Sequence, residues 1–258
     1  MYKVVFFDVD GTLLSEIDRS IPLSTREAID KLIEKGIKVV VATGRPYNLC
    51  EEFKVMGIDT VISANGAHIK RNDEVIYKSA LSTETVRDIS AFAKLNGHGI
   101  SYFTEQFAMN GIGSDDERIM KALNETLSLT QYPEKMSSLS EEVYCICLYA
   151  DDREAQKFVD SFPRLRFIRF HSYVTNVLEE KEVSKSFAIK KVLDHLKICR
   201  SEAIAFGDGG NDIDMLEYVG LGIAMGNGDE RLKQKADYVT KKASEDGISY
   251  ALKNFGVI

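Results

Sequence analysis

The sequence predicts an α/β protein built on a parallel β-sheet, with an α+β layer inserted between the two halves of the sheet domain. Short apolar runs alternate with amphipathic helical segments at both ends of the chain, which is typical of βαβ units. The middle of the chain instead contains two helical segments, each followed by a hairpin-like pair of strands. With 258 residues, 44% of them hydrophobic, the chain can form one large core or two smaller ones.

The N-terminal elements follow from the spacing of apolar residues. The run KVVFF is apolar and β-branched or aromatic after its lysine, which predicts a buried strand. A capped amphipathic helix then ends at Gly36, and a later strand leads into a hairpin with RNDE at its turn. The expected elements are strands at 3–7 and 37–43, helices at 24–36 and 45–57, and the strand with its hairpin at 59–79.

The C-terminal end repeats this alternation, whereas the middle does not. The expected C-terminal elements are helices at 184–197, 210–220, 229–236 and 245–255, and strands at 202–207, 221–226 and 237–240. In the middle, helices at 84–95 and 152–162 precede strand pairs near 101–110 and 165–179. We therefore expect a discontinuous α/β core at 1–81 and 182–258, and an inserted α+β domain at 82–181.

The composition excludes several classes of function. A formal charge of −7 and a pI near 5.3 argue against general affinity for nucleic acid or acidic membranes. The apolar run near the N-terminus is too short for a signal peptide or membrane anchor, and no other segment approaches a membrane span. The cysteines lack the spacing of a metal site or disulfide framework, which favours reduced thiols and a cytoplasmic protein.

Polar residues follow three of the apolar runs, in the segments FFDVDGT, VVVATGR and IAFGDGGND. Parallel sheets bind ligands at the carboxyl ends of their strands, and these ends share one edge of the sheet. We therefore expect the polar side chains to converge there. They are Asp8, Asp10, Thr43, Asp208, Asn211 and Asp212.

The paired carboxylates next to a buried strand indicate a cation. Desolvating a lone carboxylate costs several kcal/mol or raises its pKa until it becomes neutral. Asp8 and Asp10 point to the same side of their strand, and Asp208 adds a third carboxylate from another strand. Hard oxygen donors without a nearby cluster of histidine or cysteine favour Mg²⁺ over zinc.

If the substrate is a phosphate monoester, these carboxylates repel it. Two unit-charge pairs at about 4 Å repel by roughly 8 kcal/mol at an effective dielectric constant of about 20. A divalent ion and a lysine offset this repulsion, and Lys185 lies just before a helix. Thr43 and Gly44 lie at the start of another helix, where backbone amides and the helix dipole favour an anion.

Four segments together resemble a known family. DVDGT near the N-terminus, ATGR after the second strand, a lysine before a helix and the late GDGGND resemble the four motifs of the haloacid dehalogenase (HAD) superfamily of phosphatases. The insert resembles the large α/β cap of the Cof-type sugar-phosphatase branch. The resemblance implies a Rossmann-like core with an inserted cap. It also implies Mg²⁺-dependent hydrolysis of a small phosphorylated metabolite, with sugar phosphates as the first expectation, through an aspartyl-phosphate.

The resemblance also implies a role for each residue. Asp8 is expected to be the nucleophile, and Asp10 the general acid and base. Asp8, Asp208 and the backbone carbonyl of Asp10 are expected to hold Mg²⁺, while Asp212 orients Lys185 or a metal-bound water. The groups expected to bind the phosphoryl oxygens are Thr43, Lys185 and Asn211, with backbone amides around Val9 and Gly44.

The sequence leaves two other functions possible and the role of one residue undecided. A phosphomutase or phosphotransferase would pass the phosphoryl group from Asp8 to another acceptor, and a non-catalytic regulatory module would keep it. Asn65 in SANGA predicts a turn, because Asn-Gly is a strong turn signal, but it also follows a third strand and can face the site. The four histidines share no ligand spacing, so each is expected at the surface or in the core.

Overall fold

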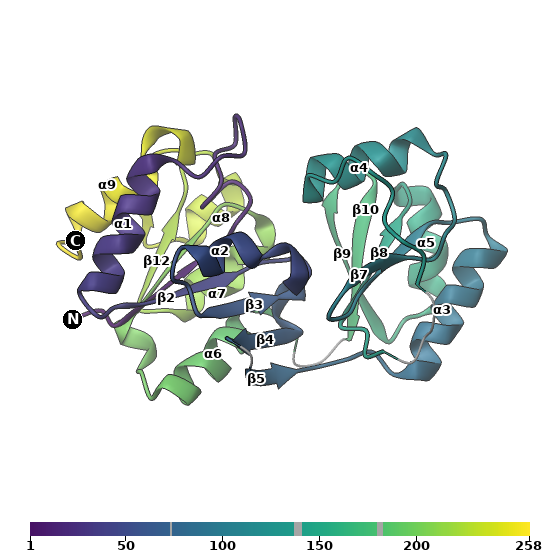
Figure 1. Ribbon diagram of the computed structural model, residues 1–258, viewed down its shortest axis with the longest axis horizontal. Helices are drawn as coiled ribbons and strands as arrows, with labels where there is room; N and C mark the ends of the chain where they lie inside the picture. The colour runs from purple at the N-terminus through teal and green to yellow at the C-terminus, as the bar shows by residue number, and fades with distance from the viewer. Residues whose placement is uncertain (73, 137–140, 180–182) are drawn as a thin grey trace. The chain divides into compact units, whose positions relative to one another are not determined.

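The computed structural model describes residues 1–72, 74–136, 141–179 and 183–258, and it confirms the predicted α/β fold class (Figure 1). The chain divides into two compact units. The first comprises Met1–Gly44, Cys50–Tyr77 and Ser184–Ile258, and the second comprises Arg45–Leu49 and Lys78–Val183. The predicted boundary between 181 and 182, and residue 73 of the predicted RNDE turn, lie outside the described residues.

One sheet of eight strands forms the centre of the first unit. Its strands are β1 (Val4–Phe7), β2 (Lys38–Ala42), β3 (Thr60–Ser63), β4 (His68–Arg71), β5 (Glu74–Lys78), β11 (Ala203–Gly207), β12 (Leu221–Ala224) and β13 (Tyr238–Val239). Their order is β13-β12-β11-β1-β2-β3-β4-β5, parallel from β13 to β3, with β4 antiparallel to β3. The chain order reverses at β1, and such a switch point is where open α/β sheets bind ligands.

Helices cover the sheet because its parallel strands are apolar on both faces. The helices of this unit are α1 (Leu23–Glu34), α2 (Glu51–Val55), α6 (Lys185–Leu196), α7 (Ile213–Tyr218), α8 (Glu230–Lys235) and α9 (Gly247–Asn254). Apolar residues of α6, α7 and α8 share one core with Val4 and Phe6 of β1, while α1 packs against α9 (Figure 1). Within the described part of the chain, no helix has the length and hydrophobicity needed to cross a bilayer.

The second unit has its own antiparallel sheet, in the order β7-β6-β8-β10-β9. Its elements are α3 (Thr83–Leu95), β6 (Ile100–Phe103), β7 (Phe107–Met109), α4 (Glu117–Leu127), β8 (Cys145–Tyr149), α5 (Asp152–Ser161), β9 (Leu165–His171) and β10 (Val174–Glu179). Apolar residues of α3 and α5 share a core with β6 and β8. A capping box at Asp151 begins α5, and Ser82 caps α3.

Two elements differ from the sequence prediction. The helix expected at 45–57 is a short 3₁₀ turn at Tyr47–Leu49 followed by α2. Pro46 disfavours helical backbone at the residue before it, and the residue that precedes α2, Cys50, provides no side-chain cap. The prediction also lacked α4, which begins where Asp116 accepts a hydrogen bond from the Arg118 amide.

Candidate active site

Three parallel strands of the first unit end side by side. Phe7 of β1 pairs with Val41 of β2 and with Phe206 of β11. Asp8 follows directly, and its backbone amide donates a hydrogen bond to the Phe206 carbonyl at 3.0 Å. The residues that follow the three strands are therefore delivered to one edge of the sheet.

A buried ammonium group joins two carboxylates at this edge. Lys185 Nζ donates to Asp8 Oδ1 and to Asp212 Oδ1, each at 2.5 Å, and the lysine is only 1% exposed. Ser184 fixes the start of α6 at this lysine, because its hydroxyl accepts a hydrogen bond from the Phe187 amide. Burial lowers the pKa of Lys185, but the charges of Asp212 and Asp8 outweigh it and hold this pKa above its ordinary value. Lys185 therefore remains a cation at neutral pH.

Asp208 adds a third carboxylate. One oxygen each from Asp8, Asp208 and Asp212 lie within 4.8 Å of one another. Burial, followed by the charge of Asp212, raises the pKa of Asp8 to about 7 in spite of Lys185. Burial, followed by the charge of Asp8, raises the pKa of Asp208 to about 9. Ionising both carboxylates is therefore unfavourable in the folded protein, and a bound cation would make it favourable.

Asp212 is occupied by hydrogen-bond donors of the protein. Its Oδ1 accepts from Lys185, and its Oδ2 accepts from the backbone amides of Asp208 at 3.0 Å and Gly209 at 2.9 Å. Gly207 allows this close approach, since a Cβ there would lie 2.6 Å from the Asp212 Cβ. Asp212 thus orients both the lysine and the backbone that carries Asp208.

The turn after β1 holds the Asp208 side chain from the other side. Gly11 has φ +83°, and a Cβ at this position would overlap with Asp208 Oδ2. Thr12 Oγ1 donates to Asp208 Oδ1 at 3.0 Å. Asn227 Nδ2 donates to the Gly11 carbonyl at 2.7 Å, and its Oδ1 accepts from the Ala243 amide at 3.0 Å. This turn is therefore fastened to the C-terminal part of the chain.

Thr43, Gly44 and Asn211 lie around Asn65. The Asn65 amide donates to the Thr43 carbonyl at 3.0 Å, and a Cβ on Gly44 would lie 3.2 Å from Asn65 Oδ1. Asn211 Nδ2 donates to the same Oδ1 at 3.2 Å. Asn65 has φ +54° and is buried, so it both forms the turn and lies beside the expected phosphate-binding residues.

The side chains of Asp10 and Val9 do not belong to the carboxylate cluster. The Asp10 side chain is 43% exposed, and its Oδ1 accepts from Arg19 Nη2 at 2.9 Å. The Val9 side chain is fully buried, so a ligand can meet only its backbone. Among the described residues, the group of clustered acidic oxygens comprises Asp8, Asp208 and Asp212, and Asp10 is not part of it.

Sequence reasoning missed Thr12, Arg19 and Asn227 as parts of this site. Asn227 follows β12, another parallel strand of the same sheet, so the rule that selected Asp8 and Asp208 also selects it. Thr12 ends the DVDGT segment itself. Arg19 lies in an irregular loop with φ +59°, and no periodic pattern in the sequence indicates its position.

The fold and the site combine a parallel α/β sheet with a buried cluster of aspartates and a lysine at the carboxyl ends of its strands. Residues 5–252 match the haloacid dehalogenase-like hydrolase family, and the chain belongs to this family. The Bacillus subtilis protein YkrA, provisionally named a phosphatase, is 36% identical over 259 residues, which cover 99% of this chain and 98% of YkrA.

Two further comparisons agree with this assignment. Bacillus subtilis YitU, named as a 5-amino-6-(5-phospho-D-ribitylamino)uracil phosphatase, is 28% identical over 98% of this chain and 97% of the YitU chain. The structure of BT4131, described as a HAD subclass IIB sugar phosphatase, has a TM-score of 0.86 and 35% identity, and the alignment covers 99% of this chain and 100% of BT4131. The protein is thus a HAD-superfamily phosphatase, as predicted.

Proposed function

We propose that this phosphatase uses Mg²⁺ to hydrolyse small phosphorylated metabolites, sugar phosphates foremost, through an aspartyl-phosphate on Asp8. The observation that carries the proposal is the buried cluster in which Lys185 bridges Asp8 and Asp212 beside Asp208. The likeness to BT4131 supports sugar phosphates as the substrate class. The compound named for YitU carries its phosphate on a ribityl chain, which is closely related chemistry.

Asp8 acts as the nucleophile in this proposal. The carboxylate oxygen that does not bind Lys185 attacks phosphorus, and the bond between phosphorus and the ester oxygen breaks. Asp10 gives its proton to that oxygen, which leaves as an alcohol. Asp10 then takes a proton from a water molecule as this water attacks phosphorus, so that Asp8 is regenerated and inorganic phosphate is released.

The residues present fit a hard divalent cation. Burial and mutual repulsion raise the pKa values of Asp8 and Asp208, so a cation among them would be bound favourably. Carboxylate and carbonyl oxygens suit Mg²⁺, and the proposed ligands are Asp8, Asp208 and the backbone carbonyl of Asp10. Asp212 already accepts three hydrogen bonds and is proposed to stay outside the coordination. When bound, the cation neutralises part of the charge on Asp8 and on the phosphoryl oxygens.

We propose that protein groups stabilise the remaining charge of the phosphoryl group. These groups are the side chains of Lys185, Thr43 and Asn211 and the backbone amides of Val9 and Gly44. A cation at about 4 Å from one phosphoryl charge contributes roughly 4 kcal/mol at an effective dielectric constant of about 20. Lys185 suits this role because it is held rigidly and stays ionised. Preorganised groups of this kind need no reorganisation during the reaction.

We also propose that residues 82–181 act as a cap domain that admits small substrates. The segment supports this role because the described part of it folds around its own sheet and core, and it interrupts the first unit in the sequence. Caps of this kind exclude bulk water and select the leaving group. The net charge of −7 further disfavours nucleic acid and acidic membranes as partners.

The experiment is a screen for phosphate release from phosphorylated metabolites: sugar phosphates, sugar-alcohol phosphates, flavin mononucleotide and pyridoxal phosphate. We expect Mg²⁺-dependent turnover that EDTA abolishes and added Mg²⁺ restores, and no turnover by the Asp8→Asn variant. Steady turnover by that variant would contradict the assignment of Asp8 as nucleophile. A single burst without further release would instead favour the regulatory module, and transfer to a sugar without release would favour the phosphotransferase.

A further inference from the structure

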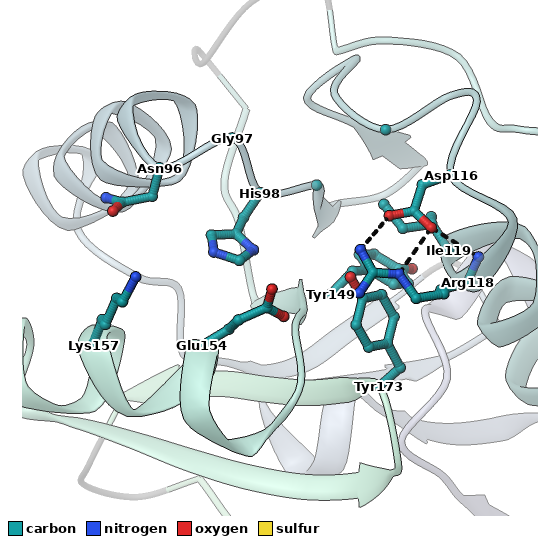
Figure 2. A pocket seen from close by; sticks show the side chains of 12 residues that line it. Asn96, Gly97, His98, Asp116, Arg118, Ile119, Tyr149, Glu154, Lys157 and Tyr173 are labelled. Carbon is teal, nitrogen blue, oxygen red and sulfur yellow. Dashed lines mark hydrogen bonds and ion pairs between the residues drawn. The ribbon is translucent and has the colours of Figure 1, made fainter.

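The second unit contains a cavity that is lined entirely by its own residues, at the C-terminal end of α3 and near the starts of α4 and α5 (Figure 2). Its volume is about 220 Å³. Pockets for drug-sized ligands measure roughly 300–1,000 Å³, so this cavity suits a smaller molecule. Its polar lining residues include His98, Asp116, Arg118, Glu154, Lys157 and Tyr173, together with Asn96 and Tyr149.

His98 is the residue that points to a ligand. The residue is only 8% exposed, and its ring is directed into the cavity (Figure 2). The ring packs edge-on against Phe158, with centroids 5.5 Å apart. Within the described ranges, no protein group forms a hydrogen bond with either ring nitrogen. Neither ring nitrogen is among the buried side-chain atoms that lack a partner in the described part of the chain, so both are accessible, and the imidazole is available to a molecule bound in the cavity.

The charged groups at one end of the cavity are already satisfied. Arg118 pairs with Asp116 through two contacts, Nη2 to Oδ2 at 2.8 Å and Nε to Oδ1 at 3.2 Å. The same guanidinium lies 4.7 Å from the centre of the Tyr173 ring. Arg118 and Asp116 therefore form an ion pair, and the charge of Glu154 also contributes to the raised pKa of Arg118.

One acidic and one basic side chain, Glu154 and Lys157, line the cavity with His98. Glu154 Oε2 accepts from the Asp151 amide at 2.9 Å in the capping box of α5, which leaves its other oxygen for a ligand. Lys157 lies one turn further along α5 and forms no ion pair with the described residues, and its amine extends toward Asn96 (Figure 2). The residues around the cavity do not form a described group of three acidic or histidine ligands close enough to hold a metal ion.

We propose that this cavity binds a small zwitterion of the amino-acid class, with its carboxylate against Lys157 and His98 and its ammonium group against Glu154. A purely anionic ligand would bring a negative charge toward Glu154, and a purely cationic ligand would bring a positive charge toward Lys157. Both arrangements place a ligand charge beside a protein charge of the same sign, which weakens binding. A ligand with both signs satisfies all three side chains.

The test is isothermal titration calorimetry of the full chain with glycine, L-alanine and L-serine, with acetate and ethylamine as probes of a single charge. We expect the amino acids to bind in the millimolar range or tighter, and each single-charge probe to bind at least about tenfold more weakly. Backbone amide NMR should place the shift changes at 96–99 and 154–157. Absence of binding, equal binding of acetate or ethylamine, or shift changes elsewhere would each overturn the proposal.

Three variants complete the test. Lys157→Met removes an exposed ammonium, and Glu154→Gln removes a charge while keeping an oxygen for the Asp151 amide, so both variants should fold. Each should weaken glycine binding at least about tenfold. Lys121→Met is the matched control, because this exposed lysine lies on α4 but does not line the cavity. Unchanged affinity in the first two variants, or equal loss in the control, would contradict the assignment.

Discussion

Lys185 stabilises two carboxylates that would otherwise be buried without a partner. Asp212 is fully buried and Asp8 is 7% exposed, and both accept hydrogen bonds from this ammonium. Removing one member of a buried ion pair is costly, because the charge left behind has lost its solvation and its partner. The same lysine therefore contributes to the stability of the fold, in addition to its proposed role in binding phosphate.

Replacing Lys185 with Met should lower the free energy of unfolding by roughly 3 kcal/mol in the absence of metal. The loss should be smaller with excess Mg²⁺, because a bound cation takes over part of the charge balance. Thermal denaturation with EDTA and with Mg²⁺ measures both quantities. Lys190→Met is the control, since this lysine is exposed on the same helix. Equal losses in the two variants would show that Lys185 does not balance the buried carboxylates.

Asp10→Asn separates formation of the proposed phosphoenzyme from its hydrolysis. Without a general base the water attack slows by about 10²–10⁴-fold, so the aspartyl-phosphate on Asp8 should accumulate with an activated substrate. Intact-mass spectrometry after rapid quenching should show one added phosphoryl group. Asp18→Asn, an exposed change in the same loop, should turn over normally. Wild-type turnover by Asp10→Asn would remove the acid and base role.

At the scale of the element, the turn after β1 links backbone conformation to the carboxylate cluster. Gly11 is required twice, for its positive φ and for the space that Asp208 occupies. Gly36 at the end of α1 has a similar φ of +74°, but nothing lies within 4 Å of the Cβ position there. Substituting Gly36 therefore tests backbone strain alone, whereas substituting Gly11 tests backbone strain together with displacement of Asp208.

Gly36→Ala should cost about 1 kcal/mol of stability, because a left-handed residue with a Cβ is strained, and Gly11→Ala should cost more, because its Cβ would also overlap with Asp208 Oδ2. Gly11→Ala should in addition raise the Mg²⁺ concentration for half-maximal activity by about 10- to 100-fold, which is the usual effect of disturbing support around a metal site. Titration of phosphatase activity with Mg²⁺ measures this shift. A Mg²⁺ requirement that is the same in both variants would show that Asp208 is not a metal ligand.

The sequence predicted the buried strands well because their signal is local. β1 and β11 are continuous apolar runs, and each ends at a polar residue that marks the edge of the sheet. α4 was missed although Asp116 caps it, because its amphipathic pattern lies beside a glycine-rich segment. The pairs Asp10–Arg19 and Asn227–Gly11 depend on loop conformations, which no periodicity encodes.

At the scale of the whole molecule, the cluster makes stability depend on pH. In the unfolded chain aspartate ionises near pH ~3.9, whereas burial and neighbouring charges raise the pKa of Asp8 to about 7 and that of Asp208 to about 9. Between these values the folded state holds protons that the unfolded state has released. The stability that these bound protons contribute is therefore fully present below pH ~4. It is lost progressively as the pH rises through the folded-state pKa values of about 7 and about 9.

The metal-free protein should consequently have a lower melting temperature at pH 9 than at pH 6, by about 2–4 °C for each kcal/mol lost. Excess Mg²⁺ should flatten this decline, because the metal-bound state carries these carboxylates ionised at little cost. Differential scanning calorimetry in EDTA and in Mg²⁺ across this range provides the measurement. The double variant Asp8→Asn/Asp208→Asn is the control, since it removes both titrating groups and should lose most of the slope. A wild-type slope that matches the double variant would show that the cluster does not hold its protons, and the case for a resident cation would lose its electrostatic basis.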